Sequence, residues 1–122
     1  MNNEKNILLQ SKIDTSNLIS IVIPCYNEQD NIGDVITELN KAISSIRDFS
    51  FEIIVIDDGS TDNTPQVLEN LKNAIPMLQV VRIEENSGQS AAMVLGINKA
   101  NGNYIITMDA DGQNDPNDIP RL

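Results

Sequence analysis

Short apolar runs and helical spacings of apolar residues alternate along the chain. Apolar, mostly β-branched runs occupy residues 20–23, 51–56, 78–83 and 104–108. Continuous runs of this kind are typical of strands that are buried on both faces of a parallel sheet. Proline cannot donate a ladder hydrogen bond, so we expect Pro24 to end the first strand.

Between these runs, apolar residues recur every three or four positions, which indicates helices. The stripe that begins after Asn31 contains Ile32, Val35, Ile36, Leu39, Ala42, Ile43 and Ile46. We expect a second helix with Thr64 as its N-cap and Pro65 at its first position, running to about residue 73, and a third over 90–100. The order of elements predicts an α/β fold with a Rossmann-like parallel sheet of alternating strands and helices.

The length of 122 residues predicts a single domain. Residues 1–18 are largely polar and are expected to form a leader, with the α/β domain over 19–122. No apolar run approaches the roughly 20 residues that cross a bilayer, and the first ten residues lack the pattern of a signal peptide. We therefore expect a soluble chain in the cytoplasm.

The charge balance excludes one large class of partners. Eight Lys and Arg residues face 18 Asp and Glu residues, a net charge of −10, which argues against nucleic-acid binding. Two Tyr, two Phe and no Trp leave few platforms for stacking bases. An acidic protein that binds a phosphate ligand needs a cation. Cys25 is the only cysteine, so no intramolecular disulfide forms and a reducing compartment fits.

Acidic side chains follow the predicted strands. In a parallel sheet with right-handed crossovers, the carboxyl ends of the strands share one edge, and ligands bind there. The loops at this edge are 24–28, 57–62, 84–89 and 109–113, and three of them begin with carboxylates. Crowded like charges are costly unless a cation, hydrogen bonds or solvent relieve them, so a ligand is expected.

Asp109 and Asp111 are the strongest candidates for binding a cation. In an extended segment, residues i and i+2 point to the same side, so both carboxylates can converge on one ion. Mg²⁺ takes oxygen ligands at roughly 2.0–2.1 Å and shares them with substrate phosphates. A solvated acidic loop is the alternative. An EF-hand would use Asp109, Asp111 and Gln113, but Asn114 and Pro120 replace its required Gly and Glu.

Asp57, Asp58 and Asp62 allow two interpretations. They can form an Asx-turn and cap the following helix, a role expected for Asp62 together with Thr64. Asp57 directly follows the strand, so its carboxylate could instead accept hydrogen bonds from a nucleobase imide or a ribose hydroxyl.

Two further segments also remain open. The backbone N–H groups of 86–89 precede a helix and could face an anion, or the segment could be a simple glycine turn. Tyr26 could stack on a base or pack on its own loop.

Four segments in order resemble the family 2 glycosyltransferases of the GT-A fold. They are residues 21–28, 57–64, 86–93 and 109–111. Residues 88–93 and 119–122 look most like the polyprenyl-phosphate branch, which includes dolichyl-phosphate mannose synthases and bacterial undecaprenyl-phosphate sugar transferases. The resemblance covers residues 19–122.

The resemblance implies a site for a nucleotide-sugar, a UDP- or GDP-sugar, and a lipid phosphate as acceptor. The residues implied for the nucleotide-sugar are Pro24, Tyr26, Glu28, Asp57, Asp58 and Asp109. Asp109, Asp111 and Gln113 would hold Mg²⁺ or Mn²⁺ against the diphosphate, and Asp111 is the implied catalytic residue. The metal would neutralise charge on the leaving nucleoside diphosphate.

The chain departs from the family pattern in two ways. Gly112 stands where the family usually has Leu, and Asp115 where it usually has Pro, so a more flexible and acidic metal loop is expected. Leu122 follows Gln113 by only nine residues (122 minus 113), so we expect the donor-binding portion of a longer enzyme, inactive alone. The full-length enzyme is expected at the cytoplasmic face of the membrane. An unpaired sheet edge would favour a homodimer.

Two other classes of protein share this size and architecture. A receiver-like signalling module needs its acid pair after the first strand and a late lysine, but here the pair follows the second strand and no lysine follows residue 99. A nucleotidyltransferase needs a glycine- and arginine-rich phosphate loop after the first strand, which is absent.

Overall fold

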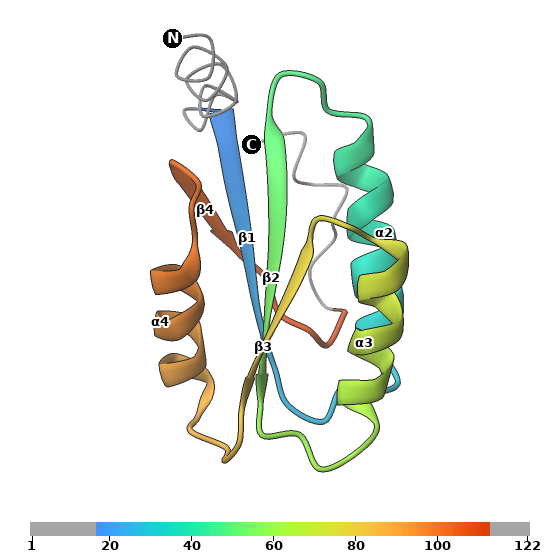
Figure 1. The fold of residues 1–122 in the computed structure, drawn as a ribbon, viewed down its shortest axis with the longest axis vertical. Coiled ribbons are helices and arrows are strands. Elements are labelled where there is room, and N and C mark those ends of the chain that lie inside the picture. The colour runs from blue at the N-terminus through green and yellow to red at the C-terminus, as the bar shows by residue number, and fades with distance from the viewer. Residues whose placement is uncertain (1–16, 113–122) are drawn as a thin grey trace, which may run out of the picture.

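A parallel sheet with helices on both faces is the framework of the structure, a computed structural model that describes residues 17–112 (Figure 1). In chain order the elements are β1 (Leu18–Cys25), α2 (Ile32–Ser44), β2 (Ser50–Asp58), α3 (Thr64–Ala74), β3 (Leu78–Ile83), α4 (Gln89–Lys99) and β4 (Tyr104–Thr107). The predicted alternation of strands and helices is confirmed. Most of the expected leader, together with Gln113, Asp115 and residues 119–122, lies outside the described residues.

The four strands lie in the order β3-β2-β1-β4, and every neighbouring pair is parallel. All four therefore end at the same side of the sheet, as Figure 1 shows. β1 and β2 pair along their whole common length, from Leu18↔Ser50 to Cys25↔Asp57. The loops that follow the strands are brought together by this register.

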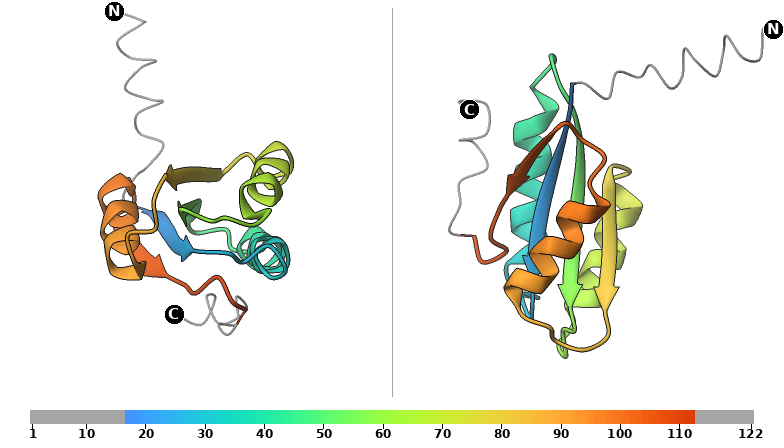
Figure 2. Two further views of the ribbon diagram at one scale, coloured as in Figure 1. Left: turned by 90° about the horizontal axis from the view of Figure 1, so that it is seen from below. Right: turned by 90° about the vertical axis from the view of Figure 1, so that its left-hand side faces the viewer.

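Two separate apolar layers hold the helices to the sheet. α2 and α3 cover one face and α4 covers the other, as the end-on view in Figure 2 shows. The larger core cluster contains Ile21, Ile23 and Leu39, whereas Ile54, Ile56 and Ala92 form the core beneath α4. α4 lies so close to the sheet that a Cβ atom at Gly96 would overlap the Val22 side chain. Within residues 17–112, no helix has the length and apolar content to cross a membrane.

The expectation that Pro24 ends the first strand is wrong. β1 continues to Cys25, and Pro24 pairs with Ile56 of β2. On the other side, the register with β4 ends at Val22↔Thr107, so Pro24 has a strand neighbour on one side only. Proline is tolerated in such an edge-like position because no neighbour requires its missing N–H group.

Three other expected boundaries shift. β2 runs through Asp57 and Asp58, which were expected in the loop. α3 has Asn63 at its N-cap position, so Thr64 is the first helical residue rather than the cap. β4 ends at Thr107, one residue earlier than expected. Asp57 and Asp58 are part of β2 although aspartate has a low strand propensity, because hydrogen bonds from other segments satisfy their carboxylates.

Glu52 is a buried carboxylate near the amino end of β2 that the sequence did not single out. It is 8% exposed and accepts hydrogen bonds from the Ser20 hydroxyl (2.5 Å) and the Asn101 backbone N–H (2.7 Å). The side chains of Asn101 and Gln79 each donate to its other oxygen at 3.2 Å. Burial opposes ionisation of Glu52, but these hydrogen bonds outweigh it and hold its pKa below the ordinary value of 4.5.

We expect Glu52→Gln to lower the free energy of unfolding by about 1–3 kcal/mol at neutral pH, because a carboxylate that accepts four hydrogen bonds is replaced by a single amide oxygen. The folded-state pKa of Glu52 is lowered, so its stabilisation is complete above about pH 4.5 and is lost as the pH falls through the folded pKa. Urea denaturation over a pH series checks this. If the difference in free energy of unfolding between wild type and Glu52→Gln stays constant into the acid range, the predicted pH dependence is wrong.

Candidate functional site

A cavity of about 450 Å³ opens at the carboxyl ends of the strands. This volume lies within the range of about 300–1,000 Å³ that is usual for small-molecule sites. Its walls include Pro24, Tyr26, Glu28, Asp58, Asp109 and Asp111, which sequence analysis selected. Asp57, which was also predicted to bind the nucleotide-sugar, does not line the cavity. With Asn86, Gly88 and Gln89, the lining comes from four separate segments of the chain.

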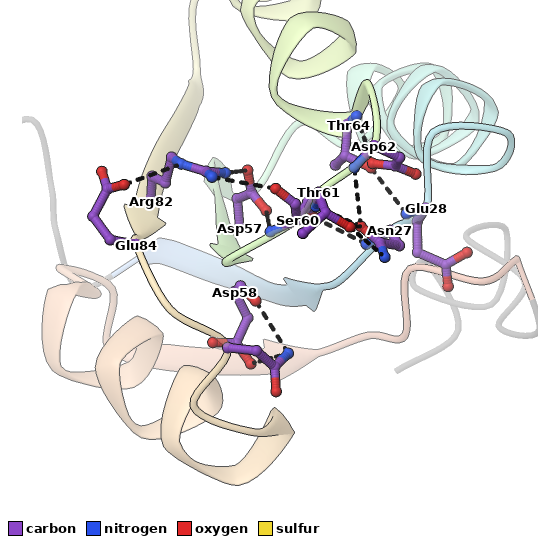
Figure 3. A network of polar contacts seen from close by, with 11 residues as sticks. Asn27, Glu28, Asp57, Asp58, Ser60, Thr61, Asp62, Thr64, Arg82 and Glu84 are labelled. Carbon is purple, nitrogen blue, oxygen red and sulfur yellow. Dashed lines mark hydrogen bonds and ion pairs between the residues drawn. The ribbon is translucent and has the colours of Figure 1, made fainter.

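Asp57 lies behind the cavity. Its side chain is 1% exposed, and its carboxylate accepts hydrogen bonds from Arg82 Nη1 at 2.7 Å and the Ser60 N–H at 3.1 Å (Figure 3). Arg82 also donates to the Ser60 carbonyl oxygen at 3.2 Å. Arg82 was missed by sequence analysis because its pairing with Asp57 depends on the register between β2 and β3. The expected contact of Asp57 with a base or ribose stays a prediction.

Asp58 points to the opposite face from Asp57, because successive strand residues alternate. Its carboxylate accepts hydrogen bonds from the Ser87 N–H and hydroxyl, both at 2.8 Å, and from the Gly88 N–H at 2.9 Å. Asn86 Nδ2 adds a longer contact of 3.3 Å. These N–H groups of the 86–89 segment are therefore bonded to an anion of the protein itself, which fits the turn interpretation of the segment.

Asp62 takes the capping role that was expected of it. Its Oδ1 atom accepts from the Thr64 N–H at 2.8 Å, and its Oδ2 accepts from the Gln29 N–H at 3.3 Å. Desolvation acts to raise the pKa of Asp62, but the hydrogen bonds from Thr64 and Gln29 outweigh it, so the pKa lies below its ordinary value. Thr64 uses its hydroxyl oxygen differently, as an acceptor for the Glu28 N–H at 2.9 Å.

Asp109 and Asp111 lie beyond the end of β4, Asp109 in an irregular segment and Asp111 in a turn. Met108 and Ala110 are buried in the larger core cluster, and Asp109, Ala110 and Asp111 all line the cavity. Gln89, at the start of α4, donates to Asp109 Oδ1 at 3.4 Å, a contact that sequence analysis missed.

The two aspartates form an open pair. Within residues 17–112, no cluster of three or more Asp, Glu, His or Cys side chains could by itself hold a metal ion. An open pair suits a cation that also binds substrate phosphates. Gln113, the third expected ligand, lies outside the described residues. Gly112 has a φ of 82°, which favours glycine over the leucine of the family pattern.

The sequence model described as Glycosyl transferase family 2 matches residues 20–122. The chain belongs to this family. The resemblance of the four segments is thereby confirmed, and the membership gives no support to a receiver-like module or a nucleotidyltransferase.

Relatives of the chain within this family include bacterial transferases named for an undecaprenyl-phosphate acceptor. This chain is 40% identical over 106 residues to the undecaprenyl-phosphate 4-deoxy-4-formamido-L-arabinose transferase of Pseudomonas fluorescens strain Pf0-1. The alignment covers 85% of this chain and 31% of that protein. The Proteus mirabilis protein of the same name is 39% identical over 114 residues, covering 92% of this chain and 34% of that protein. The chain thus spans about a third of the length of these relatives.

Solved structures of glycosyltransferases share the fold. The Staphylococcus aureus TarS 1-349 structure in complex with UDP-GlcNAc has a TM-score of 0.67 and 31% identity, covering 76% of this chain and 26% of that one. The mannosyltransferase PcManGT of Pyrobaculum calidifontis, in complex with GDP-Man and Mn²⁺, has a TM-score of 0.69 and 27% identity, covering 76% of this chain and 27% of that one. The expected GT-A type of α/β fold is confirmed.

Cys25 lies in the wall of the cavity and is 4% exposed. Its burial first, and then the neighbouring carboxylates led by Asp57 and Glu28, raise the pKa of the thiol from 9.0 to about 12. We therefore expect iodoacetamide to label the native protein at least about a hundredfold more slowly than the urea-unfolded chain at mildly alkaline pH, because thiolate is the reactive form. Mass spectrometry of timed samples measures both rates, and Cys25→Ser gives the background. Equal rates would contradict a buried, neutral thiol.

Proposed function

We propose that this chain is the donor-binding part of a glycosyltransferase that moves a sugar from a UDP- or GDP-sugar to a polyprenyl phosphate, with the help of Mg²⁺ or Mn²⁺. The observation that carries the proposal is the convergence of Tyr26, Glu28, Asp58, Asp109 and Asp111 on one cavity. The names of the undecaprenyl-phosphate transferases support the acceptor. The complexes of TarS and PcManGT with nucleotide-sugars support the sugar donor.

Pro24 and Tyr26 supply the part of the wall proposed to hold the base and ribose. Tyr26 is 46% exposed at the cavity, so its ring can cover a planar base. Glu28 also lines the cavity, and its carboxylate is proposed to accept hydrogen bonds from the hydroxyl groups of the ribose. Asp57 is retained as a base- or ribose-binding residue, although it reaches a ligand only if Arg82 or Ser60 releases its carboxylate.

The metal is proposed to bind Asp109 and Asp111, with Gln113 as a further ligand. When bound, it supplies a positive charge that stabilises the leaving nucleoside diphosphate. The described donor set fits this ion, since both carboxylates line the cavity and leave space for phosphate oxygens. Without a cation, the acidic wall would repel a diphosphate. Mn²⁺ in the PcManGT complex supports the assignment.

The acceptor chemistry is consistent with the residue content of the site. A polyprenyl phosphate is already an anionic nucleophile, so it needs no strong general base. The chain contains no histidine, and Asp111 is proposed as the catalytic residue that acts on the reacting diphosphate. A lipid phosphate would place the full-length enzyme at the cytoplasmic face of a membrane.

We expect the protein to bind UDP-GlcNAc or GDP-mannose only when Mn²⁺ or Mg²⁺ is present. Asp109→Asn and Asp111→Asn should each weaken metal-dependent binding at least about tenfold, because each removes one charged ligand of the ion. Isothermal titration calorimetry with and without Mn²⁺ measures the affinities.

Asp48→Asn is the matched control, since Asp48 is an exposed carboxylate in the loop that precedes β2, at the other end of the sheet. It should leave binding unchanged. Binding that is independent of metal, or no binding to either nucleotide-sugar, would refute the proposed site.

We also propose that β4 mediates a homodimer. Among residues 17–112, β4 is an edge strand of the sheet, and no strand pairs with its outer side. Tyr104 and Ile105 on this strand are 56% and 41% exposed. An unpaired strand of this kind offers its N–H and C=O groups to a second copy.

Light scattering over a concentration series should show dimers that Ile105→Lys dissociates, because a charge on the edge strand opposes pairing. Val94→Lys provides the control, since Val94 is 57% exposed on α4 and lies outside the strand. A monomer at every concentration would exclude the dimer.

A further inference from the structure

Asn27 joins two of the loops that surround the cavity. It lies in the β1–α2 loop, yet its polar partners all belong to the β2–α3 loop, more than 30 residues away in the chain (Figure 3). Its Oδ1 atom accepts hydrogen bonds from the Thr61 N–H at 2.8 Å and the Asp62 N–H at 3.3 Å. Its own N–H donates to Ser60 Oγ at 2.9 Å, so side chain and backbone both bridge the loops.

The backbone of Asn27 has a φ of 52°, the only positive φ at a non-glycine residue within 17–112. Asparagine adopts this left-handed conformation more readily than most residues. The chain bends at Asn27 in this conformation. The bend allows the amide of Asn27 to face the β2–α3 loop while the next side chain, Glu28, points away from the polar network, as Figure 3 shows.

Both neighbours of Asn27 line the cavity, whereas Asn27 itself does not. Tyr26 is 46% exposed and is not buried by other side chains. Glu28 is held through its backbone N–H, which donates to Thr64 Oγ1 at 2.9 Å, and through its Oε1 atom, which accepts from Asn31 Nδ2 at 3.0 Å. The position of Tyr26 therefore depends on the backbone of the residue that follows it, Asn27, which is anchored to Ser60.

We propose that Asn27 is a positioning residue for the sugar donor. It acts by fixing the β1–α2 loop so that Tyr26 and Glu28 face the cavity before a ligand arrives. This inference rests on the proposed function, and it assigns no direct contact with the ligand to Asn27. A loop that is ordered in advance loses less conformational entropy on binding, so the hydrogen bonds of Asn27 contribute to affinity.

Three variants separate the two properties of Asn27. Asn27→Gly keeps the left-handed backbone accessible but removes the hydrogen-bond acceptor. Asn27→Ala removes both properties. Asn27→Asp keeps the acceptor and tolerates the backbone conformation, and it loses only the longer Nδ2 hydrogen bond to Thr61 Oγ1 at 3.2 Å, so it is the conservative variant that should rescue the function.

The first readout is affinity for UDP-GlcNAc or GDP-mannose with Mn²⁺, measured by calorimetry. We expect Asn27→Gly and Asn27→Ala to raise the Kd about tenfold, as loss of a net hydrogen bond of about 1.4 kcal/mol implies, and Asn27→Asp to stay within about threefold of wild type. Glu52→Gln is the control for general destabilisation, because Glu52 lies near the amino end of β2 and does not line the cavity. It should lower the thermal midpoint without changing the Kd.

The second readout needs no ligand. Amide hydrogen exchange followed by NMR should show the Thr61 N–H exchanging at least about tenfold faster in Asn27→Gly than in wild type, with protection restored in Asn27→Asp. Equal exchange rates in wild type and Asn27→Gly would show that Asn27 does not order the loop.

The two readouts distinguish the possible failures. If wild type binds neither nucleotide-sugar, the proposed function fails, and the exchange rates alone decide whether Asn27 orders the loop. If wild type binds and Asn27→Gly binds equally well, the positioning role is wrong even where exchange accelerates. A Kd raised equally by Glu52→Gln would also refute it, since the effect would then be one of overall stability.

Discussion

The alternation of side chains at the end of β2 is the constraint on which the site depends. Asp57 and Asp58 are consecutive, so their carboxylates leave the strand on opposite faces. Asp57 fixes the β2–α3 loop and β3 through Ser60 and Arg82, and Asp58 fixes the loop before α4 through Ser87 and Gly88. One strand end thereby anchors the segments on both sides of the sheet. A shift of one residue in register would exchange these partners and break both sets of contacts.

Anchoring of this kind explains how an acidic protein keeps several carboxylates at one edge. Buried carboxylates are costly unless they are paired or hydrogen-bonded. Asp57 has a salt bridge with Arg82, and Asp58 receives N–H and hydroxyl donors. Within residues 17–112, no buried side-chain nitrogen or oxygen lacks a hydrogen-bond partner. Asp109 and Asp111 line the cavity beside Asp58.

A further buried carboxylate, Glu52, lies near the opposite end of the sheet. Glu52 connects β1, β3 and the α4–β4 loop through hydrogen bonds from Ser20, Gln79 and Asn101. The sheet therefore has a buried carboxylate network near each end, and the one at the carboxyl ends of the strands adjoins the cavity. This separation allows the stability of the fold and the geometry of the site to be varied independently by substitution.

The sequence by itself determined the order of strands and helices, the parallel sheet, and the edge where the candidate residues meet, because periodicity is a local property of the chain and crossovers in parallel sheets are almost always right-handed. It also selected Tyr26, Glu28, Asp58, Asp109 and Asp111, which share the cavity. It misplaced the end of β1 at Pro24, and it gave no sign of the partners Arg82, Gln89 and Asn101. Only the tertiary structure decided that Asp57 lies behind the cavity while Asp58 lines it, and that Asn27 joins two loops. These features depend on register and on contacts between segments far apart in sequence, and such contacts leave no local pattern.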